Sequence, residues 1–264
     1  MAPARAEQRR LPRAEQALLV TAVRFLGSGD SFGSGGRLQT CIMVDGAHQR
    51  FVLDCGASSL IAMRAQGIEP NSIDAILLTH FHGDHCAGVP FVLMDAMLGS
   101  KRTKPIVIAG PPGTAARMDA LREVLFPGSH VMKPKFEVDF IEMEPWRVNE
   151  VHGLRITPYP ALHTPETAPT ILRVEVDGKV VTYTGDTEWT DALITAADGA
   201  DLFISECYYY EKRIKMHMNY VTLRAHLGDL RVKAIVLTHM SEDMLQHAAE
   251  VPERCASDGM IIAL

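Results

Sequence analysis

The sequence lacks long hydrophobic runs, paired cysteines and a surplus of basic charge. No stretch approaches the roughly 18 apolar residues of a membrane helix, and the N-terminus has no apolar core typical of a secretory signal, so we expect a cytoplasmic protein with no membrane partner. Five cysteines without CxxC spacing argue against a disulfide framework. With 26 Lys and Arg against 32 Asp and Glu, the net charge is −6. We therefore expect no stable binding to nucleic acid.

The composition that remains is that of an ordinary folded protein. Hydrophobic residues make up 47% of the chain and charged residues 22%, which is typical of a globular domain. A length of 264 residues allows a sizeable core. Residues 1–19 are polar and rich in arginine, which predicts a weakly ordered arm, and residues 20–264 are expected to form a single domain. Eleven histidines are left to be explained.

Short apolar runs alternate with helical stretches after the arm. We expect strands at residues 21–26, 40–44, 50–53, 75–78, 106–109, 135–143, 146–151, 154–158, 170–176, 179–184, 202–205, 234–237 and 260–264. We expect helices at residues 58–66, 113–125, 190–197 and 220–227. Asp177-Gly178 is a two-residue hairpin turn. The pattern predicts an α/β sandwich.

The strongest chemical signal is Thr79-His80-Phe81-His82-Gly83-Asp84-His85, directly after the buried strand at 75–78. His80 and His82 project to the same side of an extended chain. Asp84 and His85 follow a glycine that permits a bend, and Asp84 is also placed to cap a helix starting near residue 87. Imidazoles and carboxylates are the ligands that Zn²⁺ prefers. The motif therefore predicts metal binding, with two ligand pairs that could serve two adjacent ions.

Three further candidate ligands also follow apolar strands: His163, Asp186 and His239. Each alone is weak, because a single histidine after a strand is more often a capping or surface residue. Together with the first motif they form a set of seven. Cys86, next to His85, is interpreted as a small buried residue rather than a ligand.

These residues resemble the metallo-β-lactamase fold hydrolases. The HxHxDH pattern matches at His80, His82, Asp84 and His85, and the later ligands match in order. The segments Phe25-Leu26-Gly27-Ser28-Gly29 and Leu53-Asp54-Cys55-Gly56 are similar to the ribonuclease Z and phosphodiesterase branch. The resemblance implies a four-layer αββα sandwich with the metal site at one edge, between the two sheets.

The resemblance also implies a role for each ligand. His80, His82 and His163 would hold one metal, Asp84, His85 and His239 the second, and Asp186 would bridge both. Asp54 would orient a ligand from outside. The ions would be two divalent metals, with zinc favoured and manganese or iron as alternatives.

Glu206 and His217 match a pair that assists the leaving group in ribonuclease Z-like enzymes. The match is incomplete, because Ser205 replaces the usual histidine and Met218-Asn219 the usual Ser-Thr. The alternative is that both are ordinary loop residues. We include Glu206, His217 and the ligand Asp84 as candidate catalytic residues.

The expected function is a dinuclear metal-dependent hydrolase, a phosphodiesterase that uses a metal-bridging hydroxide on a small or single-stranded phosphodiester. The metal site would keep a residual positive charge on an acidic protein, which favours a small anionic substrate. A lactonase, thioesterase or β-lactamase activity is the alternative, because the same metals polarise a carbonyl group. A tRNA 3′-end processing endonuclease is disfavoured, since only 23 residues lead from His163 to Asp186, where bacterial ribonuclease Z carries a long arm. A degenerate metal-binding or ligand-sensing domain without activity is disfavoured, because all seven ligands are intact. A homodimer is left as an alternative to a monomer.

Overall fold

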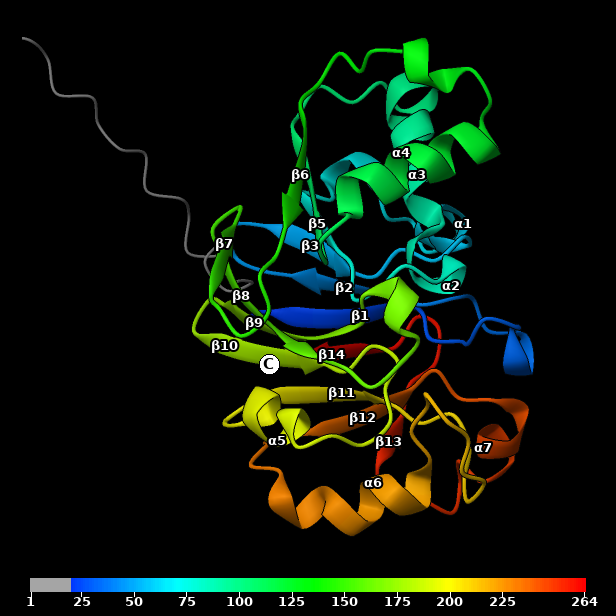
Figure 1. The fold of residues 1–264 in the computed structure, drawn as a ribbon, viewed down its shortest axis with the longest axis vertical. Coiled ribbons are helices and arrows are strands. Elements are labelled where there is room, and N and C mark those ends of the chain that lie inside the picture. The colour runs from blue at the N-terminus through cyan, green and yellow to red at the C-terminus, as the bar shows by residue number, and fades with distance from the viewer. Residues whose placement is uncertain (1–19) are drawn as a thin grey trace, which may run out of the picture.

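Two seven-stranded sheets form the centre of the computed structural model, which describes residues 20–264 without the side chain of His130 (Figure 1). The first sheet has the order β14 (Ile261–Ala263), β1 (Ala22–Gly27), β2 (Cys41–Asp45), β3 (Arg50–Leu53), β4 (Ala75–Leu77), β5 (Ile106–Gly110), β6 (Val138–Glu142). The second has the order β13 (Arg254–Cys255), β12 (Ile235–Thr238), β11 (Leu202–Glu206), β10 (Lys179–Tyr183), β9 (Thr170–Val176), β8 (Leu154–Pro160), β7 (Asn149–Val151).

Both sheets divide into an antiparallel part and a parallel part. In the first sheet, β14, β1, β2 and β3 pair antiparallel, and β3 to β6 pair parallel. In the second, β7 to β10 pair antiparallel and β10 to β13 parallel. Strands in the parallel parts end at a common edge of each sheet. Loops that leave this edge can bring side chains from both sheets to one place.

Helices cover the outer face of each sheet. They are α1 (Ser59–Ala65), α2 (Gly83–Cys86), α3 (Gly88–Met94), α4 (Thr114–Leu125), α5 (Ala192–Ala197), α6 (Tyr220–His226) and α7 (Glu242–Gln246). In Figure 1, α1 to α4 lie on the side of the first sheet and α5 to α7 on the side of the second. One apolar cluster fills the space between the sheets, and two others lie between each sheet and its helices. The predicted four-layer αββα sandwich is confirmed.

Most predicted strands and helices are present, with shifted ends. The predicted strand at 135–143 shortens to β6, and that at 146–151 begins only at Asn149, because Trp146 has a φ of 65° and turns the chain. The hairpin turn joins β9 to β10 as predicted, with Asp177 and Gly178 both at positive φ. No range was predicted for α2, α7 or β13, and α3 begins at Gly88, close to the predicted helix start near residue 87. The predicted arm, residues 1–19, lies outside the described residues.

Within residues 20–264, no helix is long and apolar enough to cross a membrane. Cys86 is buried, as predicted.

Candidate metal centre

Seven predicted ligands meet at the edge where strands of both sheets end. The first motif follows β4, His163 follows β8, Asp186 follows β10, and His239 directly follows β12. Apart from the partly buried His82, all are buried. Ligands distant in sequence are adjacent because these strands all run toward the same edge.

The first ligand group consists of His80, His82, His163 and Asp186. Nδ1 of His82 lies 3.2 Å from Nε2 of His80 and 3.0 Å from Nε2 of His163. One oxygen of Asp186, Oδ2, lies 3.9 Å from each of those Nε2 atoms. The predicted three-histidine set is thus brought together beside Asp186.

The second group consists of Asp84, His85, Asp186 and His239. Nε2 of His85 lies 3.3 Å from Nε2 of His239 and 3.3 Å from Oδ2 of Asp84. The other oxygen of Asp186, Oδ1, lies 3.3 Å from His85 and 3.5 Å from His239. Asp186 therefore directs one oxygen to each group, which is the geometry that a bridging carboxylate requires.

The protonation of the first group suits cation binding. Burial lowers the pKa of His80 well below its ordinary value and that of His163 to about 4, so both rings are neutral near pH 7. Nδ1 of His163 donates to the carbonyl oxygen of Met216 at 2.7 Å, which leaves Nε2 as a bare lone pair facing Nδ1 of His82. Three ring nitrogens, one each from His80, His82 and His163, thus converge on one another, and such a set can hold a cation when all three are unprotonated.

The second group carries the anionic ligands. Burial acts to raise the pKa of Asp84, but His85 and His239 outweigh it, so the pKa is lowered and the carboxylate is ionised. Oδ1 of Asp186 and Nδ1 of His239 are buried without a hydrogen-bond partner. An orphaned, buried carboxylate oxygen is costly unless it binds a cation. The residues present therefore fit divalent metal ions.

Asp54 orients one histidine of each group. Its Oδ2 accepts a hydrogen bond from Nδ1 of His85 at 2.7 Å, and its carboxylate also accepts from the backbone N–H and hydroxyl of Thr79. Oγ1 of Thr79 lies 3.0 Å from Nδ1 of His80. Because the Thr79 hydroxyl donates to Asp54, it accepts from His80. Both rings then direct Nε2 toward the ligand groups.

Replacing Asp54 by asparagine should weaken metal binding while preserving the fold. Asp54 has a φ of 59°, which asparagine also tolerates. The asparagine amide would face Nδ1 of His85 either with its N–H group or with an oxygen that accepts a weaker hydrogen bond than the carboxylate does. Because His85 is then held less well, we expect metal affinity to fall about 10- to 100-fold. Titration with a chromogenic chelator measures this change. Asp119→Asn, at an exposed position of α4, is the control, and equal affinities in the two variants would contradict the orienting role.

Asp84 does not cap a helix, and that prediction is wrong. Asp84 lies inside the short helix α2, and the helix α3 has no side-chain cap. The Asp84 carboxylate instead accepts a hydrogen bond from Nε2 of His239 at 3.1 Å. The bend after Gly83 turns Asp84 inward, toward the second ligand group.

Glu206 and His217 form a hydrogen-bonded pair beside this centre. Nδ1 of His217 lies 3.0 Å from Oε2 of Glu206 and 3.8 Å from Oδ2 of Asp186. Burial acts to lower the pKa of His217, but the Glu206 carboxylate outweighs it and the pKa is raised. Because Nδ1 is held by Glu206, Nε2 is the nitrogen left to act in the cavity. Neither residue is thus an isolated loop residue.

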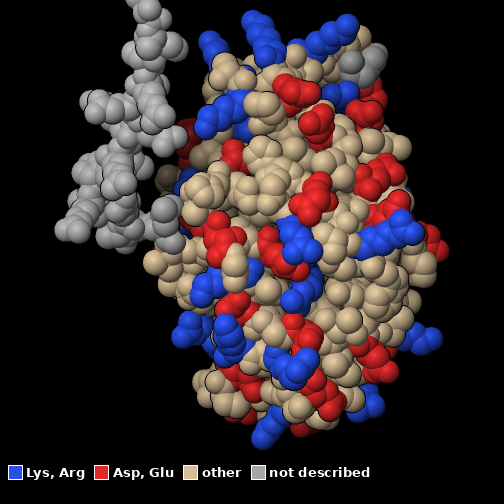
Figure 2. Space-filling model, turned by 90° about the vertical axis from the view of Figure 1, so that its left-hand side faces the viewer, with Lys and Arg blue, Asp and Glu red and all other residues tan. Residues whose placement is uncertain are grey.

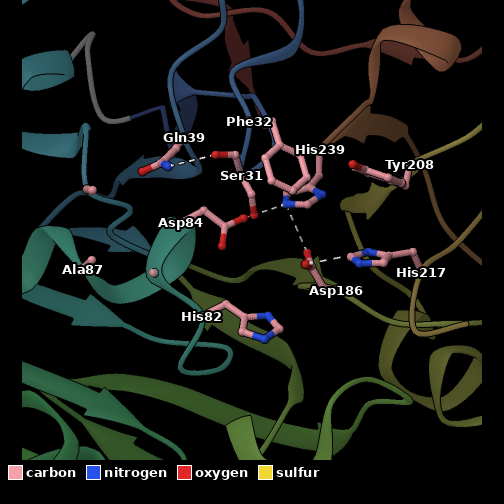
Figure 3. Close-up of a pocket in the computed structure, with 12 residues that line it drawn as sticks. Ser31, Phe32, Gln39, His82, Asp84, Ala87, Asp186, Tyr208, His217 and His239 are labelled. Carbon is pink, nitrogen blue, oxygen red and sulfur yellow. Dashed lines mark hydrogen bonds and ion pairs between the residues drawn. The ribbon is translucent and has the colours of Figure 1, made fainter. Parts of the chain in front are cut away.

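A cavity of about 540 Å³ opens above the ligands. Its lining includes His217, Tyr208, Phe32 and Gln39 (Figure 3). Phe32 lies in the glycine-rich loop after β1 and is 83% exposed. Nothing in the sequence alone gives a role to Phe32, Gln39 or Tyr208, because none belongs to a motif.

The fold and the two ligand groups define the class: the protein is a metal-dependent hydrolase of the metallo-β-lactamase fold. A family model described as "Anti-Pycsar protein Apyc1" matches residues 21–256. The chain therefore belongs to the Apyc1 family.

Named relatives agree with the predicted branch. Ribonuclease Z of Agathobacter rectalis is 26% identical, over 88% of this chain and 91% of that protein. Ribonuclease Z of Mycobacterium bovis is 30% identical, over 69% of this chain and 68% of that protein. The metallo-β-lactamase fold protein YhfI from Bacillus subtilis superposes with a TM-score of 0.75 at 19% identity, covering 92% of this chain and 98% of YhfI. The resemblance to the ribonuclease Z and phosphodiesterase-like branch is confirmed.

Proposed function

We propose that the protein is a phosphodiesterase that hydrolyses a small phosphodiester. The observation that carries this proposal is the hydrogen bond between Glu206 and His217, 3.0 Å long, at the wall of the cavity. A leaving alkoxide needs a proton, and a histidine whose pKa is raised by a neighbouring carboxylate can supply it. Hydrolysis of a lactone or thioester has less need of such a donor. The pair therefore favours phosphodiesters over the carbonyl alternative.

The residues proposed to hold the metals are the two ligand groups, with Asp186 shared between them. When bound, two divalent ions supply a hydroxide nucleophile at neutral pH and neutralise charge on the phosphoryl group. The protein then contributes orientation: Asp54 and the Met216 carbonyl fix the ligand rings, and Glu206 holds His217. Zinc is the proposed metal because histidine nitrogens dominate the donor set, and manganese or iron remain alternatives.

The size of the substrate is proposed from the cavity and from the chain between two ligands. A cavity of about 540 Å³ is within the range of small-molecule sites. The hairpin of β9 and β10 takes up most of the interval between His163 and Asp186, so this interval carries no long arm. These two features support a small anionic substrate over a folded RNA. On the face shown in Figure 2, acidic and basic side chains are interspersed from its upper to its lower end.

A panel of substrates tests the proposal. Purified protein should contain about two zinc, manganese or iron ions per chain and hydrolyse bis-(p-nitrophenyl) phosphate. Removal of the ions with a chelator should abolish the activity, and added metal should restore it. A lactone, a thioester, a β-lactam and a precursor tRNA complete the panel. Turnover of any of these with none of the phosphodiester would refute the assignment.

A homodimer stays a proposal. It is supported by large apolar side chains that are exposed on the helical layer over the first sheet: Ile61, Leu98 and Val124.

A further inference from the structure

Tyr208 stands at the wall of the cavity, next to the candidate proton donor. Its ring is stacked on His217, with the centroids 4.9 Å apart and an interplanar angle of 28°. The centroid of its ring also lies 5.9 Å from that of His239. The tyrosine thus borders both the leaving-group pair and the second ligand group.

The backbone of Tyr208 is fixed on both sides. Its N–H donates to the carbonyl oxygen of Met218 at 2.8 Å, and its own carbonyl oxygen accepts from the N–H of Ser241 at 3.0 Å. With the backbone fixed and the ring stacked on His217, the side chain loses little further freedom when a substrate binds. These contacts favour one direction of the ring before the substrate arrives.

The hydroxyl group of Tyr208 is left available. It makes no hydrogen bond with any other described residue, although Tyr208 is partly buried. Figure 3 shows this hydroxyl turned into the cavity, on the side of His239 and Phe32. A partly buried donor that points into a reaction cavity is placed to bind an acceptor on the substrate.

We propose that Tyr208 contacts the substrate and donates a hydrogen bond from its hydroxyl to a non-bridging oxygen of the phosphoryl group. This inference rests on the proposed phosphodiesterase function. The phosphoryl oxygens bear negative charge, and a donor fixed in a partly desolvated wall stabilises it without reorganisation. The ring of Tyr208 also stacks on a face of His217, whereas Glu206 contacts the Nδ1 atom at the edge of that ring. No bond is made or broken at Tyr208, and its proton stays on the hydroxyl oxygen.

Tyr208→Phe is the direct test, because it removes the hydroxyl and keeps the ring stacked on His217. We expect kcat/KM on bis-(p-nitrophenyl) phosphate to fall about 10- to 100-fold. We also expect the metal-loaded variant to bind inorganic phosphate about tenfold more weakly by calorimetry. Metal content and thermal unfolding should match those of the wild type, which separates a substrate contact from a change in folding.

Tyr209→Phe is the matched control. Tyr209 is the adjacent tyrosine, packs edge-on against Tyr208 and does not line the cavity. It should retain wild-type kcat/KM and phosphate affinity. If the wild type hydrolyses phosphodiesters and Tyr208→Phe keeps wild-type kcat/KM and phosphate affinity, the proposed contact of Tyr208 is wrong and the proposed function stands. If the wild type hydrolyses no phosphodiester, both the proposed function and the contact to a phosphoryl oxygen are wrong.

Discussion

Asp186→Ala should leave a folded protein with almost no activity. Asp186 is the only ligand that belongs to both groups, with Oδ2 toward His80 and Oδ1 toward His85. Its removal takes one anionic ligand from each proposed metal at once. We expect the metal content to fall from about two ions per chain to below one. Activity on bis-(p-nitrophenyl) phosphate should fall on the order of a thousandfold or more.

Elemental analysis and steady-state kinetics on the same preparation measure both effects. Asp191→Ala removes a nearby exposed carboxylate that caps no backbone group of α5, and this variant should keep its metal and its activity. If Asp186→Ala kept two tightly bound ions, Asp186 would not be a bridge. Excess metal should restore activity only in part, since the shared ligand is still absent.

His217→Ala should retain its metal and lose rate according to the leaving group. An alkoxide leaving group needs a proton. Loss of the proton donor should therefore lower kcat about 100- to 10,000-fold on a substrate with such a leaving group. The p-nitrophenolate group leaves without assistance, so we expect a much smaller loss there. His226→Ala, which removes a histidine stacked on Trp189, is the control. Equal losses on both substrates, or loss of metal, would show that His217 is not a proton donor.

The pH dependence of kcat offers a second measure of the same pair. The pKa of His217 is raised above its ordinary value because the Glu206 carboxylate outweighs burial. A general acid acts while protonated, so kcat on an alkyl ester should fall as the pH rises through this raised pKa. Glu206→Gln removes the charge that raises the pKa of His217, so the fall of kcat at alkaline pH should begin at a lower pH. In His217→Ala this fall of kcat should be missing.

The ligand positions could be predicted from the sequence because each one follows a strand directly. The first motif, His163, Asp186 and His239 all come after apolar runs, and the common direction of these strands brings them to one edge. Local order was enough to identify the first motif, whereas His163, Asp186 and His239 became candidates only in combination with it. The shared position of Asp186, by contrast, was implied by resemblance, since nothing in its own neighbourhood distinguishes a bridging carboxylate from any other.

Other parts of the site depend on contacts that no local pattern encodes. Tyr208 lies in a run of three tyrosines, and only its packing against His217 distinguishes it from its neighbours. The carbonyl group of Met216 orients His163 from 53 residues away. The helix-cap role of Asp84 was wrongly predicted, because the sequence cannot tell a helix cap from a residue inside a single helical turn.

The pairing of β14 with β1 has a consequence for the time at which the protein becomes active. Among the described residues, the last strand pairs with the first, and the two ligand groups draw on residues from His80 to His239. A ribosome must therefore deliver the chain as far as Asp186 before the first ligand group is complete, and as far as His239 before the second is. Contacts this distant in sequence form slowly, so the nascent chain exposes histidines and sheet edges well before it can hydrolyse anything. Truncated translation products would accordingly be inert as enzymes and prone to aggregation.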